Sequence, residues 1–141
     1  MQIVVCSVII QTGSSFLLVR EKSTKAKGKW GLPGGKLEGS ESLIECAKRE
    51  TLEETGIRVE SLTLRAIVNK PISAEKNNVI KFVFYTHLDS VPRCDGELEN
   101  RLYALDEIKD LDDQGMIRGS EIYRILTGSF PFQELIGFEV L

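Results

Sequence analysis

Three glutamates lie close together in a predicted helix: Glu50, Glu53 and Glu54. Because a helix turns by about 100° per residue, these carboxylates occupy a single arc of about 100°. They repel one another, and they lie near the helix C-terminus, where the helix dipole disfavours anions. Helix stability therefore does not explain them, whereas a bound divalent cation would make each of these interactions favourable. The alternative is a solvated acidic face that Lys48 and Arg49 balance.

Glycines and further charged residues flank this helix at fixed distances. The stretch from Gly34 to Glu41 precedes the helix, and the stretch from Arg49 to Ile57 closes it. Together they resemble the Nudix box, which reads Gly, five residues, Glu, seven residues and then Arg-Glu-aliphatic-x-Glu-Glu-x-Gly-aliphatic. This resemblance favours the metal site over the solvated face. One position departs from the pattern, since Thr51 stands where the family prefers an aliphatic residue, and we expect only a minor change in packing. The matching positions in the box, Gly35 to Ile57, are Gly35, Glu41, Arg49, Glu50, Glu53, Glu54, Gly56 and Ile57.

The resemblance implies a fold, an activity and a cofactor. Nudix proteins are mostly hydrolases that split a diphosphate linkage in a nucleoside diphosphate attached to another group, and they use Mg²⁺ or Mn²⁺. Their fold is an α/β/α sandwich with a mixed β-sheet, in which a loop–helix–loop segment carries the box. We therefore expect one Nudix hydrolase domain over residues 1–141, and a MutT-like pyrophosphatase that acts on acid anhydrides.

The resemblance also implies a set of metal ligands. Glu53 and Glu54 are the expected principal ligands, Glu50 is a further ligand or the general base, and the backbone of Gly35 completes the coordination. Hard Mg²⁺ prefers such oxygen ligands and keeps positions for water and substrate phosphate. Bound ions can lower the pKa of a water, orient it in line and neutralise the leaving phosphate. An acidic chain is therefore compatible with an anionic substrate.

Other residues of the box are expected to hold the site in shape. The resemblance implies that Arg49, counted among the catalytic residues, pairs with Glu41 and fixes the helix against the preceding loop. Gly34 belongs to a glycine-rich segment with an unusual, tight backbone. Gly56 stands where the helix should end in a left-handed cap.

The polar loop from Asp89 to Asn100 contains two further candidates for the general base. The resemblance makes this loop relevant, because a glutamate from a later loop often contributes the base in Nudix proteins. Loops of this length in a compact domain are often functional. Glu97 is the favoured base because it follows the flexible Gly96, and Glu99 is the second candidate. The alternative for both is an ordinary exposed glutamate, and Glu50 stays open as the base.

Four residues outside the box are candidates for contact with substrate. Trp30 and Tyr85 could stack on a nucleobase, although aromatic residues at strand positions are more often part of the core. Arg20 and Lys29 could contact phosphate, although solvated surface is the simpler interpretation. The only histidine, His87, is expected at the surface near the end of a strand.

Hydrophobic patterns predict the elements that position these residues. Ser42 and Glu45 form a capping box, so the helix should run from there to Gly56. Strands and helices mix without strict alternation, which favours a sandwich with a mixed sheet. Polar loops are expected over 23–29, 70–78 and 89–100, and Leu62, Leu64, Ala66 and Val68 should share one face, as should Phe82, Phe84, Thr86 and Leu88. The other expected elements are strands at Ile3–Ile10, Phe16–Val19, Arg58–Val68, Val79–Leu88 and Leu102–Leu105, a helical turn capped by Asp106, and a last helix capped by Ser120 that uses Ile122, Ile125 and Leu126 and ends at Pro131.

Composition sets the class of protein. The chain has 141 residues, 42% of them hydrophobic and 28% charged, which excludes collagen-like and wholly disordered proteins. Eighteen Lys and Arg against 21 Asp and Glu give a net charge of −3, which argues against binding of bulk nucleic acid or anionic membranes. Three cysteines, Cys6, Cys46 and Cys94, form no CxxC pair, so a zinc site or a disulfide framework is not expected. We expect the thiols to be buried in a reducing compartment, and the sequence shows neither a signal peptide nor a membrane span. These features predict a cytoplasmic protein. We expect it to be a monomer or a homodimer.

The substrate class stays open at this level. A (d)NTP-type nucleotide is favoured because the domain is minimal and shows no long N-terminal extension. ADP-ribose or a nucleotide sugar is the alternative substrate. A different class of function, a non-catalytic nucleotide-binding sensor, is disfavoured because a pure binder need not keep clustered, mutually repelling carboxylates.

Overall fold

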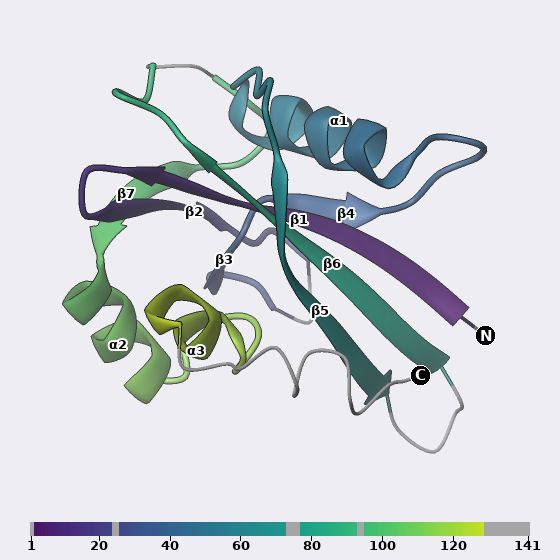
Figure 1. Ribbon diagram of the computed structural model, residues 1–141. Helices are drawn as coiled ribbons and strands as arrows, with labels where there is room; N and C mark the ends of the chain where they lie inside the picture. Colours follow the sequence, from purple (N-terminus) through teal and green to yellow (C-terminus); the bar gives the residue numbers. More distant parts are fainter. Residues whose placement is uncertain (1, 24–25, 73–76, 93–94, 129–141) are drawn as a thin grey trace.

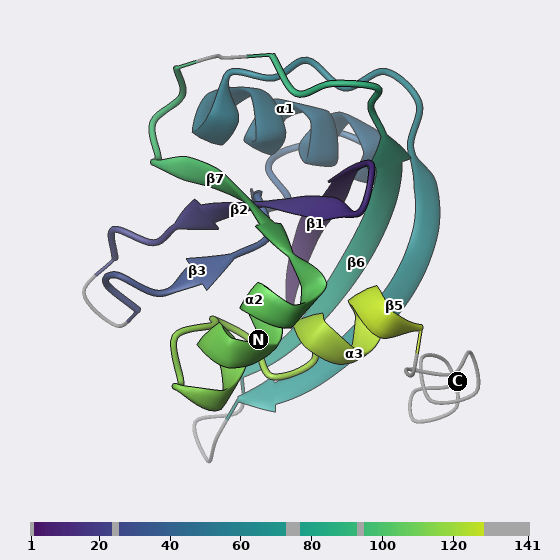
Figure 2. The same ribbon diagram turned by 90° about the vertical axis from the view of Figure 1, so that its left-hand side faces the viewer.

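A mixed β-sheet separates two helical layers in the computed structural model, which describes residues 2–23, 26–72, 77–92 and 95–128 (Figure 1). Helix α1 (Leu43–Thr55) covers one face of the sheet, while α2 (Leu105–Asp113) and α3 (Ile122–Thr127) cover the opposite face. Figure 2 shows the same three layers from the side. The expected α/β/α sandwich with a mixed sheet is therefore confirmed.

The first strand organises the sheet. Strand β1 (Gln2–Thr12) pairs in parallel with β6 (Asn77–His87) along almost its whole length, from Gln2–Asn78 to Gln11–His87. All other pairings among the described strands are antiparallel. Because β1 contacts β4 and β2 on its other edge, it links the glycine-rich segment to the hairpin. The remaining strands are β2 (Ser15–Arg20), β3 (Trp30–Gly31), β4 (Gly34–Lys36), β5 (Thr63–Ile72) and β7 (Asn100–Ala104).

Alternation along the central strands builds two separate cores. Cys6, Val8 and Ile10 of β1 are fully buried and pack with Phe84 against α1. Ile9 points the other way, into the core beneath α2 and α3. The predicted shared face of β6 is confirmed, since Phe82, Phe84 and Leu88 all join the core on the α1 side. Both helical layers are therefore held by burial of apolar side chains.

Strand β5 differs from its prediction. It begins at Thr63 rather than Arg58, because residues 57–62 form an irregular connection after α1. A β-bulge lies between Leu64 and Ala66, and it breaks the period of two on which the prediction rested. The prediction of one apolar face is consequently wrong, because Leu62 packs on the α1 side, Ala66 packs on the opposite side and Leu64 is 53% exposed.

The expected polar loop over 70–78 is also wrong at both ends. Strand β5 continues through Ile72, and β6 begins at Asn77. Backbone pairing explains the difference, because Lys70 faces Val79 and Pro71 faces Asn78 in the antiparallel ladder. Such pairing with a neighbouring strand overrides the weak strand propensity of these polar residues.

The two later helices begin at residues other than the predicted caps. Helix α2 starts after Ala104 rather than at Asp106, and the Ala104 N–H donates to Glu107 Oε1 at 2.8 Å. Helix α3 starts after Glu121 rather than at Ser120, and Glu121 has no capping hydrogen bond from its side chain. A left-handed Gly128 ends α3. Pro131, the predicted end, lies outside the described residues, and the strand expected to reach Leu105 ends at Ala104.

The cysteines in the described part behave as predicted. Cys6 and Cys46 are free thiols with no exposed surface. Burial raises the pKa of the Cys46 thiol to about 12, so it stays protonated and unreactive. Cys94 lies outside the described residues. Within the described ranges, no helix is both long enough and apolar enough to cross a membrane.

Candidate functional site

The helix that carries the glutamates is fixed at both ends by its own sequence. Ser42 Oγ accepts from the Glu45 N–H at 3.1 Å, and Glu45 Oε1 accepts from the Ser42 N–H at 3.2 Å. At the other end, Gly56 adopts a left-handed φ of 77° and donates to Leu52 O at 2.8 Å. Both caps are the predicted ones. They set where each side chain of α1 points.

The residue that departs from the family pattern lies in the core. Thr51 has no exposed surface, and its Oγ1 has no hydrogen-bond partner among the described residues. Its backbone oxygen instead accepts from Thr55 Oγ1 at 2.6 Å. Thr51 therefore takes the packing position of an aliphatic residue, at the cost of an unpaired hydroxyl oxygen.

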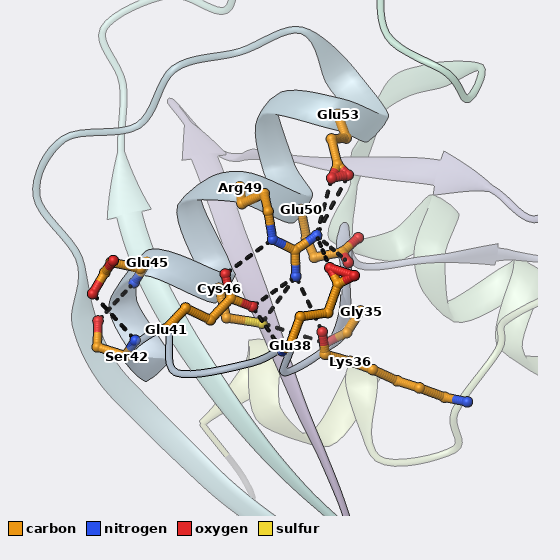
Figure 3. Close-up of polar contacts among 10 residues, drawn as sticks. All are labelled: Gly35, Lys36, Glu38, Glu41, Ser42, Glu45, Cys46, Arg49, Glu50 and Glu53. Atoms are coloured by element: carbon orange, nitrogen blue, oxygen red, sulfur yellow. Dashed lines mark hydrogen bonds and ion pairs between the residues drawn. The ribbon is translucent and has the colours of Figure 1, made fainter.

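Arg49 joins the glycine-rich segment to the glutamates of α1 (Figure 3). Its guanidinium forms a two-pronged pair with Glu41, with Nε–Oε2 at 3.0 Å and Nη2–Oε1 at 2.8 Å. The same group donates to Glu50 Oε1 and Glu53 Oε1, both at 2.9 Å, and to Lys36 O at 3.1 Å. The structure thus brings the predicted pair into contact. The bond with Arg49 lowers the pKa of the Glu41 carboxyl to about 2.

The two glycines before the helix provide space for the glutamates. The Gly34 N–H donates to Glu54 Oε1 at 2.9 Å. A Cβ atom at Gly35 would overlap the carboxyl group of Glu50, and one at Gly34 would overlap the Cys6 carbonyl and the Ser7 side chain. Neither glycine has a positive φ. In this structure the two glycines therefore let neighbouring groups pack closely against the backbone, and they do not form an unusual turn.

Burial destabilises the charged form of two of these carboxylates. It raises the pKa of Glu54 to about 7, although the Gly34 N–H acts against the rise and the charge of Glu50 adds to it. Burial also raises the pKa of Glu50, and Arg49 only partly offsets this effect. Carboxylates in this condition gain from a nearby cation, because it favours the ionised form.

The donor set fits a hard divalent cation. Carboxylates and backbone carbonyls are the oxygen ligands that Mg²⁺ prefers. In the described part of the chain, no three acidic, histidine or cysteine side chains converge on one point. Instead Glu50 and Glu53 turn toward Arg49, and Glu54 turns toward Gly34. The three glutamates that could hold a metal are therefore neighbours on α1, and each accepts a hydrogen bond from a protein donor in this structure.

The loop that carries the candidate base is joined directly to the end of α1. The Glu97 N–H donates to Glu53 O at 2.9 Å, and the Leu98 N–H donates to Glu54 O at 3.0 Å. Gly96 makes this approach possible, because a Cβ atom there would overlap the Glu54 carbonyl. Glu97 is exposed, and its backbone adjoins the C-terminal end of α1, although more than 40 residues separate the two in the sequence.

Glu99 has other partners. Its carboxylate forms ion pairs with Arg20 at 3.4 Å and Arg101 at 3.3 Å. Among the two loop candidates, Glu97 is thus the one adjoining α1, and Glu99 faces the basic edge of β2 and β7. Arg20 and Glu99 also line a pocket of about 250 Å³, together with Glu21, Lys22, Lys27 and Gly28.

The two aromatic candidates already have partners. Trp30 is 5% exposed, contacts Tyr103 edge-on at 5.1 Å between ring centroids, and lies beneath the guanidinium groups of Arg20 and Arg101. Trp30 is therefore a core residue in this structure, which is the simpler of the two interpretations that its sequence position allows. Tyr85 is half-buried, donates to Gln11 Oε1 at 2.9 Å and has a guanidinium 4.1 Å above its ring.

Two remaining candidates lie at the periphery of the site. Lys29 is half-buried, and its backbone oxygen accepts from the Glu21 N–H at 2.7 Å. No contact places its side chain against the carboxylates of α1. His87 is exposed at the end of β6, as expected.

Sequence reasoning missed an ion pair beside the site. Arg118 pairs with Glu21, and both charges act on Glu54, Arg118 favouring its ionised form and Glu21 disfavouring it. The Arg118 N–H donates to Trp30 O at 2.7 Å, which anchors it near the glycine-rich segment. No local pattern could have identified it, because the contact joins residues 97 positions apart.

Comparisons with known proteins agree with this geometry. The family model described as the NUDIX domain matches residues 1–124. The 8-oxo-dGDP phosphatase NUDT18 of Mus musculus is 32% identical over 81 residues, which are 57% of this chain and 24% of that protein. The ADP-ribose pyrophosphatase of Methanocaldococcus jannaschii is 34% identical over 76 residues, which are 54% of this chain and 45% of that protein. The matches thus span less than half the length of these two relatives.

A solved structure gives the same result. The crystal structure of a MutT NUDIX hydrolase from Burkholderia pseudomallei superposes with a TM-score of 0.67 at 30% identity, covering 76% of this chain and 86% of that one. The family model covers most of the chain, and the glutamates, Arg49 and the two glycines lie together in space as the box requires. This chain therefore belongs to the NUDIX family.

Proposed function

We propose that the chain is a hydrolase that uses a divalent metal ion to cleave a diphosphate linkage in a nucleotide derivative. The observation that carries the proposal is the arrangement of Glu50, Glu53 and Glu54 around Arg49 and Gly34 on a rigidly capped helix. Like charges at this spacing would weaken the helix without a ligand to compensate them. A (d)NTP-type substrate is the favoured one.

Mg²⁺ or Mn²⁺ is the proposed cofactor, with Glu50, Glu53, Glu54 and the Gly35 carbonyl as its ligands. When bound there, the metal ion would neutralise the charge of the diphosphate and lower the pKa of a water molecule. The Gly34 N–H holds the Glu54 carboxylate in place, and Arg49 orients Glu50 and Glu53. These contacts fix the donor atoms before substrate arrives, which lowers the cost of organising the site.

Proton removal from the attacking water falls to a carboxylate. Glu50 is one candidate, since its raised pKa brings it closer to the range in which a base works at neutral pH. Glu97 is the other, and its backbone bond to Glu53 O keeps it beside the ligands. Substitution of each by Gln separates them, because loss of the base lowers kcat and flattens the acidic limb of the pH–rate profile.

A second candidate function is cleavage of ADP-ribose or a nucleotide sugar. The relative from M. jannaschii, named an ADP-ribose pyrophosphatase, favours this candidate. The mouse relative, named an 8-oxo-dGDP phosphatase, favours a nucleotide with no second sugar. Both candidates require the same reaction at a diphosphate, so they differ in substrate and not in chemistry.

A substrate panel tests the proposal. Deoxynucleoside di- and triphosphates, ADP-ribose, nucleotide sugars and dinucleoside polyphosphates are incubated with the chain and Mg²⁺ in ¹⁸O-labelled water. Wild type is expected to release labelled phosphate, pyrophosphate or nucleoside monophosphate, and the label identifies the attacked phosphorus. Glu60→Gln, at an exposed position after α1, serves as the matched control for Glu53→Gln. Nucleotide binding without any turnover would instead indicate a sensor.

A further inference from the structure

The segment that carries Glu97 is held on both of its sides. Its N–H groups face α1, because those of Glu97 and Leu98 donate to carbonyls in the last turn of that helix. Its carbonyls face β2 and the residues that follow this strand. Glu99 O accepts from the Arg20 N–H at 2.9 Å, and Glu97 O accepts from Lys22 Nζ at 2.6 Å. The segment therefore bridges the helix of the proposed metal ligands and the edge of the sheet.

Lys22 reaches this segment through its side chain. The backbone bond from Arg20 continues the antiparallel ladder between β2 and β7 by one step. The next backbone donor with a partner, the Lys22 N–H, bonds Glu21 Oε1 at 3.1 Å instead of the segment. Among the described residues, the bond from the Lys22 ammonium group is therefore the hydrogen bond that joins residues 21–23 to Glu97.

The charge of Lys22 suits the end of α1. The C-terminus of a helix favours cations because its last carbonyls give it a partial negative charge, and the last turn of α1 contains no basic residue. The peptide group between Glu97 and Leu98 links Lys22 to this end: its carbonyl accepts from Lys22, and its N–H donates to Glu54 O at 3.0 Å. Hydrogen bonds in such a chain polarise and strengthen one another. Lys22 therefore strengthens the attachment of the segment to the helix.

The partner of Lys22 sets it apart from the neighbouring cations. Arg20 pairs with the carboxylate of Glu99, and Arg118 pairs with that of Glu21. Lys22 forms no ion pair within the described ranges, and its ammonium group bonds a backbone carbonyl. A hydrogen bond with an ionised donor is roughly twice as strong as one between neutral groups. The contact with the segment is thus the main polar interaction of this side chain.

We propose that Lys22 is a positioning residue for the hydrolysis, because it holds the backbone of Glu97 against the end of α1 and so sets where the Glu97 carboxylate works as the base. The proposal rests on the function proposed above, with Glu97 as its base. In this role Lys22 acts through Glu97 rather than through contact with the reacting atoms. A small displacement of a reacting group costs a large factor in rate, so a loosened segment lowers kcat and leaves substrate binding intact.

A direct contact between Lys22 and the substrate would have a different kinetic signature. Lys22 borders the pocket of about 250 Å³ together with Lys27. Loss of a contact that binds substrate and transition state equally raises KM and leaves kcat unchanged. Lys27 is the matched control, because it is also exposed, lines the same pocket and has no hydrogen bond to Glu97 among the described residues.

Steady-state kinetics with Mg²⁺ on the fastest substrate of the panel tests the proposal. Lys22 is exposed, so its replacement leaves both cores intact. Lys22→Met is expected to lower kcat by about tenfold, with KM within about twofold of wild type. Lys22→Arg, which keeps a charged donor, should restore most of kcat, and Lys27→Met should behave as wild type. Wild-type kcat in Lys22→Met, or a change confined to KM, would overturn the proposal.

A double-mutant cycle shows whether Lys22 acts through Glu97. Glu97→Gln should lower kcat, and Lys22→Met should lower it little further in that background, because the carboxylate that Lys22 positions is already gone. An equal loss from Lys22→Met in both backgrounds would show that Lys22 acts elsewhere. Full kcat in Glu97→Gln would likewise refute the proposal, since there would be no base for Lys22 to position.

Hydrogen exchange distinguishes this proposal from the function on which it rests. The amides of Glu97 and Leu98 should exchange faster in Lys22→Met than in Lys27→Met, because their bonds to α1 open more often. If wild type turns over no nucleotide, the proposed hydrolysis fails, and exchange alone decides whether Lys22 holds the segment. If wild type is active and Lys22→Met changes neither exchange nor kcat, the positioning role fails and the hydrolase stands.

Discussion

Arg49 is the residue on which the geometry of the site depends most. One guanidinium contacts Glu41, Glu50 and Glu53, and it also bonds the carbonyl of Lys36. A planar group with five donors can make these contacts together, whereas the ammonium group of lysine cannot. The two carboxylates of α1 are therefore oriented by a neighbour in the sequence, and the loop before the helix is held by the same side chain.

Replacement of Arg49 by lysine should keep the charge and lose the geometry. We expect Arg49→Lys to lower kcat/KM by about tenfold or more, because Glu50 and Glu53 lose their common donor. Lys48→Arg, one residue earlier, is the control and should leave activity near the wild-type value. Steady-state kinetics on the best substrate of the panel checks this. Equal kcat/KM in wild type and Arg49→Lys would show that charge alone suffices.

The pKa of Glu54, raised to about 7 mainly by burial, predicts a pH dependence of stability in the absence of metal. A carboxyl whose pKa is higher in the folded state stabilises the fold when protonated. This contribution is complete below the unfolded pKa of about 4.3 and is lost as pH rises through about 7. We therefore expect the metal-free protein to lose stability, relative to Glu54→Gln, between mildly acidic and mildly alkaline pH. Melting curves in EDTA check this, and parallel pH profiles for the two proteins would contradict it.

At the scale of elements, the end of α1 and the segment 96–98 form one unit. Gly96 allows two backbone bonds from this segment to the last carbonyls of the helix. Helix C-terminal carbonyls need partners, and here a distant loop supplies the donors. The backbone of the candidate base Glu97 is consequently attached to the helix that carries the proposed metal ligands.

Gly96→Ala tests this attachment. The added Cβ would overlap the Glu54 carbonyl, so either the loop or the helix end must move. We expect a loss of about 1–3 kcal/mol in the free energy of unfolding and a lower kcat. Gly31→Ala is the control, because the Cβ there would lie at an ordinary 3.6 Å from Arg118. Urea denaturation of both variants measures the difference, and equal stabilities would count against the close approach.

Elements with local signals could be predicted from the sequence, and elements with distant partners could not. The caps of α1 are contacts over three or four residues, so Ser42 and Gly56 identified the helix. The bulge in β5 depends on its pairing with β6, so the exposure of Leu64 had no local sign. The same holds for the surroundings of the site, since Arg118 approaches Glu21 and Glu54 from far along the chain.

At the scale of the whole molecule, a net charge of −3 becomes compatible with an anionic ligand through the position of the charges. Acidic groups gather on α1, while Lys70, Lys81 and Arg118 act on the α3 side of the sheet. A metal ion bound at α1 would attract a nucleotide there. The composition of the sequence gives the net charge, but it does not reveal that acidic and basic side chains gather in different regions of the fold.

Metal binding should therefore stabilise the whole fold. A ligand that binds only the folded state adds roughly 2.7 kcal/mol when its free concentration is about 100 times Kd. We expect Mg²⁺ or Mn²⁺ to raise the Tm of wild type and of the control Glu60→Gln, and to raise that of Glu53→Gln and Glu54→Gln much less. Scanning calorimetry across a metal titration measures this. A Tm shift of equal size in all four proteins would place the metal elsewhere.

The central claim is that the carboxylates of α1 make this chain a metal-dependent hydrolase of a nucleotide diphosphate linkage. The most direct measurement is kcat/KM with Mg²⁺ on the panel substrate that is turned over fastest, for wild type, Glu53→Gln and Glu60→Gln. We expect turnover by wild type and Glu60→Gln, abolition of turnover by EDTA, and a loss of about 10²-fold or more in Glu53→Gln. Turnover that is equal in wild type and Glu53→Gln, or that persists in EDTA, would contradict it.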